Sequence, residues 1–246
     1  MNTIKTICRA CGKEGTADVD DFTFDVFSRS GQVYPWYCPE CDVIHRREKE
    51  EQERREREEE RRNYIEEELE RAGIPRRYRV KAPPVPTVAD WLRHHAGDNI
   101  LITGETGSGK STSAGYLARG FIESEKTVRY RQMSDILDDW REARSGDYRV
   151  TSSEFFGKLE NVDLLIVDEA SPDKCVVSSS GRECMFRLLE DIYNGTCRAA
   201  VIFLGNYFRG SIGEVFGNEA AARRRLADAF VCAKIEKGGH VARIKL

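Results

Sequence analysis

The sequence lacks any long apolar run, because no stretch approaches the roughly 18 consecutive apolar residues that a membrane span requires. Residues 1–8 lack the apolar core of a secretory signal. A large excess of charge of one sign is also missing. The 39 basic and 42 acidic residues leave a net charge of −3, which is not typical of a protein that coats nucleic acid or binds a membrane. We therefore expect a cytoplasmic protein.

A disulfide framework is not expected either, because a reducing cytosol makes metal ligation the better use of eight cysteines. Four of them form two CxxC pairs, Cys8 with Cys11 and Cys38 with Cys41. Each tight turn brings two thiolates together, and two such turns complete the tetrahedral shell of a structural Zn²⁺. The alternative is two unconnected pairs of reduced thiols, and His45 could replace one sulfur.

The segment between the two pairs, residues 12–37, is longer than ordinary zinc-ribbon spacing. Alternating apolar and polar residues from Phe22 to Val26 predict a strand, and Ser30–Gly31 predicts a turn after it. We expect a small zinc-ribbon-like module over residues 1–45. The other cysteines are expected to be small buried or half-buried residues, and they are Cys175, Cys184, Cys197 and Cys232.

The composition changes at residues 46–71, where nine residues are basic and twelve are acidic. Opposite charges recur at i,i+4 spacing, as in Glu50–Arg54 and Glu58–Arg62, which favours a solvated helix. We expect a charged helical linker over residues 46–72, with a partly disordered linker as the alternative. Gly73-Ile74-Pro75 should end this helix.

Residues 73–246 alternate between apolar strand-like runs and helical segments, which favours an α/β fold with an open parallel sheet. At 246 residues and 28.0 kDa, the chain can bury one such core and carry a small appendage. The predicted strands are 99–103, 127–131, 163–167, 199–204 and 231–235, and the predicted helices are 111–123, 133–144, 181–194 and 220–229. Ligands of such a sheet bind at the carboxyl ends of its strands.

The first of these strands leads into Gly104–Ser111, which fits the phosphate-binding pattern GxxxxGK[ST]. Its glycines let consecutive N–H groups and the positive end of the next helix point at a polyphosphate. Lys110 would reach the β- and γ-phosphates, and Ser111 would hold Mg²⁺. The residues expected to contact ATP are Gly104, Glu105, Thr106, Gly107, Ser108, Gly109, Lys110, Ser111 and Thr112.

Two acids follow the apolar run Leu164–Val167. Asp168 would bind Mg²⁺ directly or through water, and Glu169 would orient and deprotonate the attacking water. Asn206 follows the next strand and would position that water or sense the γ-phosphate, unless it is an ordinary turn asparagine. With the phosphate loop, these residues predict an ATPase that uses ATP and Mg²⁺, beside a Zn²⁺ module.

These residues resemble the AAA+ helicase loaders of the DnaC/DnaI type and the related IstB transposition helper ATPases, which are bacterial or phage proteins. The resemblance runs from about Gly73 to the C-terminus. It is carried by Ala72-Gly73-Ile74-Pro75-Arg76-Arg77-Tyr78, the phosphate loop, Leu165-Ile166-Val167-Asp168-Glu169, Gly205-Asn206 and Arg223-Arg224-Arg225-Leu226. Glu105–Ser108 departs from the proline-glycine-threonine run more usual in loaders. The same variant is also seen in nucleic-acid helicases of other P-loop families.

The resemblance implies further functional residues. Arg225 is the expected arginine finger acting across a subunit interface, with Arg223 and Arg224 as alternatives, and all three could instead lie on an exposed helix face. Arg243 is the expected nucleotide-sensing arginine. Only 20 residues follow Leu226, so a full C-terminal helical lid is not expected. Candidate contacts to single-stranded DNA are Arg129, Arg131, Tyr207, Phe208 and Arg209.

The function implied by the resemblance is ATP-dependent loading of a hexameric replicative helicase onto single-stranded DNA. Self-association with ATP and docking of the helicase by residues 1–45 would go with it. The runner-up is a transposition helper ATPase that assembles on DNA and activates a transposase. A stand-alone helicase would need a second motor domain, and a small-molecule kinase would need a lid and an acceptor pocket. The expected location is the bacterial cytosol, or the host cytosol for a phage-encoded protein.

Overall fold

The computed structural model describes residues 2–30, 32–82, 85–145, 150–170, 179–206, 215–216, 219–236 and 240–244. The chain forms two compact units, Met1–Asn63 and Tyr64–Leu246. Each unit has its own strands, which belong to separate sheets. None of the described helices is both long enough and apolar enough to cross a membrane.

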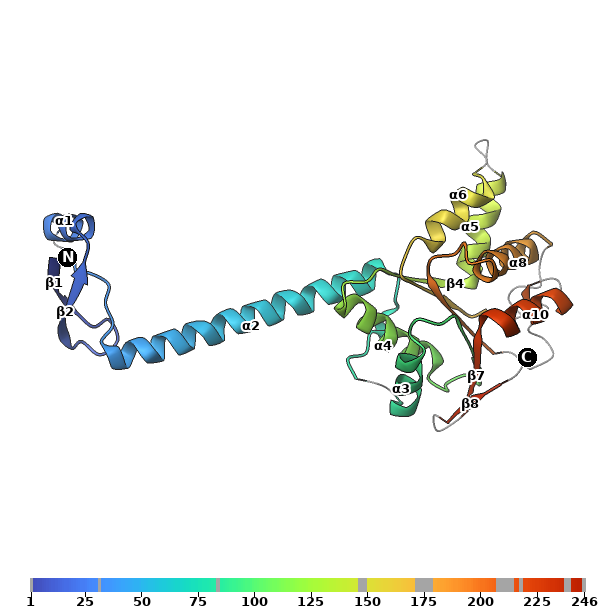
Figure 1. Cartoon of the computed structure of the whole chain (residues 1–246), viewed down its shortest axis with the longest axis horizontal. Helices are drawn as coiled ribbons and strands as arrows, with labels where there is room; N and C mark the ends of the chain where they lie inside the picture. The colour runs from blue at the N-terminus through green and yellow to red at the C-terminus, as the bar shows by residue number, and fades with distance from the viewer. Residues whose placement is uncertain are drawn as a thin grey trace. The chain divides into compact units, whose positions relative to one another are not determined.

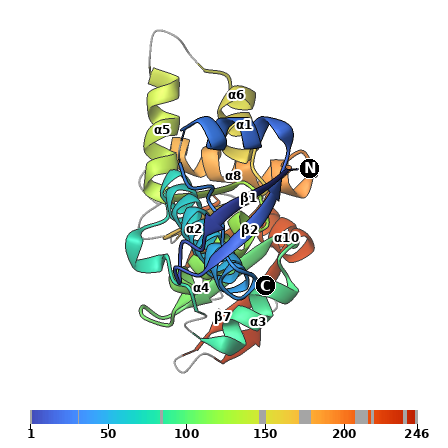
Figure 2. The ribbon, with the colours of Figure 1, turned by 90° about the vertical axis from the view of Figure 1, so that its left-hand side faces the viewer.

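The first unit is built on an antiparallel hairpin of β1 (Asn2–Ile7) and β2 (Glu14–Val19), which pairs Asn2 with Val19 and Ile7 with Glu14. Figure 2 shows this hairpin together with α1 (Asp21–Ser30). The strand predicted from Phe22 to Val26 is therefore wrong.

The physical reason is a helix-start signal at Asp20, whose Oδ1 accepts the N–H of Thr23 at 2.7 Å as an N-cap. An ion pair between Arg29 and Asp25, at 3.0 Å, spans one turn of the helix. Phe24 and Phe27 are half-buried while Phe22 is exposed, so the same residues that suggested alternation present an amphipathic helix.

The charged segment forms most of α2 (Pro39–Arg71), so the helical prediction is confirmed, although the helix begins before Arg46. Its exposed face carries ion pairs at i,i+4 spacing, including Asp42–Arg46, Glu51–Arg55 and Glu53–Arg57. The helix ends at Arg71, just before Gly73 as predicted, and Gly73 has φ 82°. There the N–H of Gly73 donates to Glu70 O at 2.9 Å and the N–H of Ile74 donates to Leu69 O at 3.0 Å.

The second unit holds a six-stranded sheet in the order β4-β5-β6-β3-β7-β8, parallel except for β8. Its strands are β3 (Ile100–Gly104), β4 (Val128–Gln132), β5 (Leu164–Asp168), β6 (Ala200–Gly205), β7 (Val231–Ile235) and β8 (Val241–Arg243). Its helices are η1 (Arg76–Tyr78), α3 (Pro86–His94), α4 (Lys110–Glu123), α5 (Met133–Ser145), α6 (Ser152–Glu160), α8 (Ser179–Tyr193) and α10 (Glu219–Ala229). The predicted α/β fold with an open, mainly parallel sheet is confirmed.

Helices cover both faces of this sheet, as Figure 1 shows for α4 and α8. Neighbouring residues of a strand point to opposite cores, because side chains alternate along a strand. Leu101 and Phe203 therefore pack with α5, α8 and α10, whereas Ile100 and Ile202 pack with α3, α4 and the end of α2. The strands are buried on both faces, which explains their continuous apolar runs.

Three of the described helices of this unit were not predicted from the sequence, namely the short 3-10 helix η1, α3 and α6. The start of α6 carries a capping box, in which Thr151 Oγ1 accepts the N–H of Glu154 at 3.2 Å. The Glu154 carboxylate in turn accepts the N–H of Thr151 at 2.9 Å. This Thr-x-x-Glu signal is visible in the sequence and would have identified α6.

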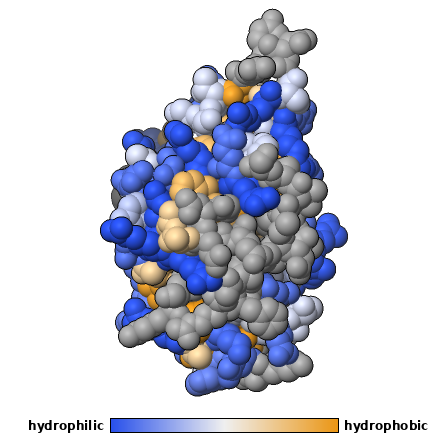
Figure 3. All heavy atoms as spheres, turned by 90° about the vertical axis from the view of Figure 1, so that its right-hand side faces the viewer, coloured by the Kyte–Doolittle hydropathy of each residue, from blue (hydrophilic) through white to orange (hydrophobic). Residues whose placement is uncertain are grey.

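Exposed apolar side chains are unevenly distributed between the two units. Of eight large apolar residues exposed in the described part of the chain, the first unit contributes Ile7, Phe22, Val26, Val33, Val43 and Ile44. Tyr64 and Tyr193 are those of the second unit. Figure 3 shows one face of the second unit, on which hydrophilic side chains surround small apolar areas.

Candidate functional site

The phosphate loop joins β3 to α4, as its sequence pattern requires. A Cβ at Gly104 would lie 2.4 Å from Ile235 O, so the loop leaves β3 against the backbone of β7 with no room for a side chain. Gly107 and Gly109 have φ values of 82° and 89°, in the left-handed region that favours glycine. Gly109 is the N-cap of α4, so the N-terminal N–H groups of this helix face the loop.

Lys110 is buried inside the curve of this loop. Its Nζ donates to Gly104 O at 2.7 Å, to Glu105 O at 2.9 Å and to Ser108 Oγ at 3.3 Å. Burial lowers the pKa of Lys110, and the carboxylate of Asp168 partly offsets that effect. The ammonium group is thus held where the loop, the helix N-terminus and an acidic side chain meet.

Asp168 is buried at the carboxyl end of β5, and both of its carboxylate oxygens accept hydrogen bonds. Oδ1 accepts the N–H of Glu169 at 2.7 Å, and Oδ2 accepts the hydroxyl of Tyr130 on β4. Burial first, and then the bond to Asp168, raise the pKa of Tyr130 far above its ordinary value, so the phenol is a proton donor at neutral pH. Tyr130 was not predicted as a site residue, because no local sequence pattern indicates a contact between two residues that are 38 positions apart.

Glu169 has φ 55°, a conformation uncommon for a residue with a side chain. The resulting bend at the end of β5 brings the N–H of Ala170 to Leu204 O of β6, at 2.9 Å. Oxygen ligands from Asp168 and from Ser111, in the first turn of α4, are of the kind that Mg²⁺ prefers. Thr112 follows Ser111 on α4, and both are half-buried.

The third predicted element, Asn206, comes directly after β6, which lies between β3 and β5 in the sheet. Asn206 is exposed, and its Nδ2 donates to Thr106 Oγ1 of the phosphate loop at 3.3 Å. The carboxyl ends of three adjacent strands therefore carry the phosphate loop, an amide and the two acids, in that order.

The predicted arginines differ sharply in their surroundings. Arg225 pairs with Glu190 at 3.0 Å, and its guanidinium lies 4.9 Å from the ring centre of Phe186. The Arg224 side chain is 81% exposed and lies 3.9 Å from Asp228. Arg243 is exposed on the edge strand β8, opposite Ala233 of β7.

Two of the candidate DNA-contacting residues bind other residues of the same chain. Arg129 donates to Lys158 O, and Arg131 pairs with Asp139 on α5. The other candidates, Tyr207, Phe208 and Arg209, lie outside the described residues.

The four N-terminal cysteines converge although 26 residues separate the two pairs in sequence. The sulfurs of Cys8, Cys11, Cys38 and Cys41 all lie within 4.8 Å of one another, and Cys11 Sγ is 3.8 Å from Cys38 Sγ. Four sulfurs placed tetrahedrally at about 2.3 Å from Zn²⁺ would be about 3.8 Å apart, so this set fits the metal. His45 is not part of the cluster, and its ring stacks on Tyr37 with centroids 4.3 Å apart.

Two cysteines of the cluster have shifted pKa values in opposite directions, because hydrogen bonds with Cys38 and Cys11 raise the pKa of Cys41 whereas the pKa of Cys8 is lowered. Burial raises the pKa of Cys8, but N–H donors led by Cys38, at 3.3 Å from the sulfur, outweigh it and leave a pKa of about 6. The isolated cysteines are different, because burial raises the pKa of Cys184 and Cys197 to about 12 and that of Cys232 to about 11. The expectation of small buried or half-buried residues holds for these three, and Cys175 lies outside the described residues.

A hollow of about 580 Å³ lies at the opposite, amino edge of the sheet, next to the end of α4. Lys81, Lys126 and Arg198 are among its basic lining residues, while Glu123 and Asp163 are acidic. The last carbonyls of α4 form the negative end of the helix dipole. Five basic and two acidic residues line this hollow, so its lining carries an excess of positive charge, and no residue of the phosphate loop is part of it.

Comparison with known proteins assigns most of the second unit to a sequence family. The sequence model of the family described as IstB-like ATP binding protein matches residues 84–245, about two thirds of the chain. No curated protein sequence matches the chain. A crystal structure of the DnaC helicase loader is similar with a TM-score of 0.50 and 15% identity, covering 65% of this chain and 99% of that one. This likeness shows the AAA+ fold.

A structure of AMPPCP-bound DnaA from Aquifex aeolicus is similar with a TM-score of 0.46 and 16% identity. The match covers 61% of this chain and 45% of that one.

Proposed function

Because the chain belongs to the family of IstB-like ATP-binding proteins, we propose that it is an AAA+ ATPase of DNA replication. In this proposal it loads a hexameric replicative helicase onto single-stranded DNA, and ATP binding and hydrolysis switch its assembly. The observation that carries the ATPase part of this proposal is the row of phosphate loop, amide and acids on adjacent strands β3, β6 and β5.

Each residue of that row has a proposed role in ATP hydrolysis. Lys110 exchanges its bonds to loop carbonyls for the β- and γ-phosphates, which the N–H groups of the loop and of α4 also bind. Ser111 and Asp168 hold Mg²⁺, which neutralises phosphate charge when bound. Glu169 orients and deprotonates the attacking water, and Asn206, which donates to Thr106 of the loop, positions that water or senses the γ-phosphate.

An arginine of the segment 223–225 acts on the nucleotide of a neighbouring subunit in this proposal. Such a guanidinium neutralises charge that develops on the γ-phosphate and makes hydrolysis depend on assembly. Arg225 is half-buried against Glu190, whereas the exposed side chain of Arg224 can reach beyond its own subunit. These surroundings support Arg224, and not Arg225, as the arginine that acts on the neighbouring subunit. Arg243 stays proposed as a nucleotide-sensing residue.

The zinc module is proposed to dock the helicase. Six large exposed apolar side chains in this small unit, Phe22 and Val26 of α1 among them, support a protein-binding surface. The four cysteines would hold Zn²⁺ as a structural ion, because no open coordination position remains for catalysis. Residues 1–45, 46–72 and 73–246 are the proposed docking module, linker and ATPase domain.

The second candidate function is a transposition helper ATPase that assembles on DNA and activates a transposase. The observation in its favour is the match to the IstB-like family over residues 84–245. It would use the same ATP site, so the partner protein distinguishes the two functions.

The test is retention of purified host replicative helicase by the immobilised full-length protein with ATP, with ADP and without nucleotide. Lys110→Ala should fail to bind nucleotide, and Glu169→Gln should remain ATP-bound and hydrolyse at least about 100-fold more slowly. Lys126→Ala, an exposed lysine of the same unit, is the matched control. Failure to retain helicase in every nucleotide state would exclude the loader function, and unchanged turnover in both variants would exclude the assigned ATP site.

A further inference from the structure

Tyr130 occupies the middle of β4, the edge strand of the sheet, and only 4% of the residue is exposed. Its hydroxyl donates to Asp168 Oδ2, while Asp168 Oδ1 accepts the N–H of Glu169 at 2.7 Å. Two donors thus fix the plane and direction of one buried carboxylate. One of the two is a side chain that belongs to none of the recognised nucleotide-binding motifs.

The residues that directly follow α2 contact the backbone of Tyr130. The N–H of Tyr130 donates to Ala72 O at 2.7 Å, and a Cβ at Gly73 would lie 2.8 Å from Tyr130 O. The segment after α2 therefore contacts the backbone of β4 at Tyr130, on the free edge of the sheet. The ring of Tyr78, in η1, lies 6.3 Å from that of Tyr130.

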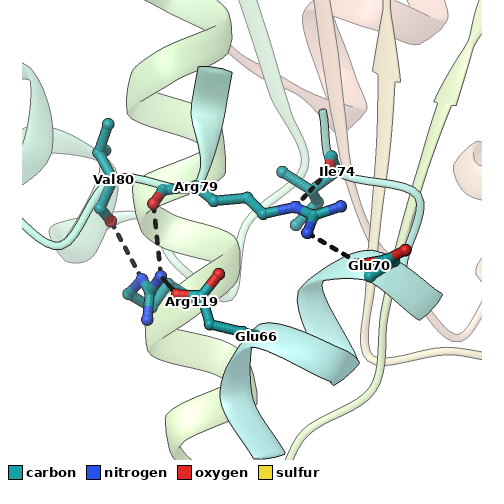
Figure 4. A network of polar contacts seen from close by, with 6 residues as sticks. All are labelled: Glu66, Glu70, Ile74, Arg79, Val80 and Arg119. Atoms are coloured by element: carbon teal, nitrogen blue, oxygen red, sulfur yellow. Dashed lines mark hydrogen bonds and ion pairs between the residues drawn. The ribbon is translucent and has the colours of Figure 1, made fainter. Parts of the chain in front are cut away.

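This segment is itself anchored on α4, the helix that follows the phosphate loop. Figure 4 shows the anchor, in which buried Arg119 pairs with Glu66 at 2.5 Å and donates to Val80 O at 3.1 Å. Arg79 donates to Ile74 O at 2.8 Å within the same network. A Cβ at Gly115 of α4 would lie 2.3 Å from Tyr78 O, so η1 packs directly on that helix. Tyr130 is therefore held between Asp168 and a segment fixed to the nucleotide-binding helix.

We propose that Tyr130 is a positioning residue, whose hydroxyl holds the Asp168 carboxylate in the orientation that Mg²⁺-nucleotide binding requires. This inference rests on the proposed ATPase function. A hydroxyl that only satisfied a buried acceptor would affect stability. It would leave the Mg²⁺ dependence of nucleotide binding unchanged.

The experiment compares full-length wild-type protein with Tyr130→Phe, which removes one oxygen and keeps the ring. Binding of a fluorescent ATP analogue is measured across a Mg²⁺ series that starts in EDTA. Loss of a hydrogen bond to a charged group should raise the half-saturating Mg²⁺ concentration about tenfold. Binding in EDTA, which depends on the loop and Lys110, should be unchanged.

The matched control is Tyr78→Phe, which removes the same atom from the neighbouring ring. Its Mg²⁺ series should coincide with that of the wild type. A Tyr130→Phe series that coincides with wild type would overturn the inference while leaving the ATP site intact. Absence of ATP binding by the wild-type protein would instead overturn the proposed function.

A second measurement keeps the Tyr130 hydroxyl in the protein and does not require the Tyr130→Phe variant to fold. Site-specific 3-fluorotyrosine at position 130 keeps the ring and the hydroxyl, and its ¹⁹F resonance reports on the bond to Asp168. The resonance should shift when Mg²⁺ is added to the nucleotide complex but not when Mg²⁺ is added to the Asp168→Asn variant with nucleotide. A resonance that is insensitive to Mg²⁺ in the wild-type background would also overturn the inference.

Discussion

The guanidinium of Arg119 pairs with the carboxylate of Glu66 at 2.5 Å, and this bond joins the phosphate-loop helix α4 to the last turns of α2. Only 5% of the Arg119 side chain is exposed, and the same guanidinium donates to Val80 O. Glu66 is the one acidic partner of Arg119 in the described part of the chain, and a buried cation depends strongly on such a partner.

Glu66→Gln should lower the free energy of unfolding of the second unit by about 1–3 kcal/mol, because Arg119 loses its counter-charge while remaining buried. Urea unfolding followed by tryptophan fluorescence measures the change. The matched control is Glu67→Gln, an exposed neighbour on the same helix, which should change stability by less than about 0.5 kcal/mol. Equal effects of the two variants would show that the Arg119 pair contributes nothing specific.

The zinc cluster predicts a metal effect confined to the first unit. Purified protein should contain about one zinc per chain, and Cys11→Ser should lose it because one of four thiolate ligands is gone. Hydrogen exchange of the β1–β2 amides should then accelerate, while ATP binding by the second unit should persist, since the two units are separate. Cys197→Ser, a half-buried cysteine outside the cluster, is the control and should retain zinc. Zinc-free protein with a protected hairpin would contradict the metal assignment.

The sequence predicts the second unit well, because its strands are buried on both faces and give continuous apolar runs such as Leu164–Val167. The fold-defining motifs are local too, as in Gly104–Ser111. Local alternation failed at Phe22–Val26, where a short amphipathic segment fits a helix as well as a strand, and the N-cap at Asp20 decides. The hydrogen bond from Tyr130 to Asp168 could not be predicted from the sequence, because it depends on β4 and β5 being neighbours in the sheet.

Substitution of the neighbouring arginines Arg224 and Arg225 of α10 should affect different properties, ATP turnover for the first and stability for the second. Arg224→Ala should lower ATP turnover of the assembled protein by about 10³-fold without changing nucleotide affinity of isolated chains, as expected of a finger acting in trans. Mixing Arg224→Ala with Glu169→Gln should restore part of the activity, because each chain supplies what the other lacks. Sedimentation with ATP and a single strand should confirm that both variants still assemble.

Arg225→Ala should act mainly on stability, because it removes the pair with Glu190 and the contact with Phe186. The expected loss is about 1–2 kcal/mol in the free energy of unfolding. If Arg225→Ala instead abolished turnover with unchanged stability, and Arg224→Ala did not, the finger would be Arg225.

Glu160, the last residue of α6, should make the stability of the second unit depend on pH. Its carboxyl is buried, Oε1 has no hydrogen-bond partner in the described part of the chain, and Asp191 of α8 adds a like charge. Burial first, and then Asp191, raise the pKa of Glu160 from 4.5 to about 7. Cys197 is a further titratable group near this carboxyl, but with a pKa of about 12 it stays neutral in this range.

Because the pKa is higher in the folded state, the folded protein holds its proton more tightly than the unfolded chain between pH 4.5 and 7. The contribution of Glu160 to stability is therefore complete below pH 4.5 and is lost as the pH rises through 7. After allowance for solvent screening, this loss should be on the order of 1–2 kcal/mol. Glu160→Gln removes the titration and should make the protein more stable than wild type at pH 8, with a smaller difference at pH 5.

Fluorescence of Trp140 is a suitable readout, because its ring lies 5.4 Å from that of Phe156 on the same helix as Glu160. Urea midpoints at pH 5 and pH 8 for wild type and Glu160→Gln give the difference directly. Glu142→Gln, an exposed residue of α5, controls for the loss of one negative charge and should leave the pH dependence unchanged. A Glu160→Gln variant with the same pH dependence as wild type would mean that water reaches Glu160 and that its carboxyl ionises in the ordinary range.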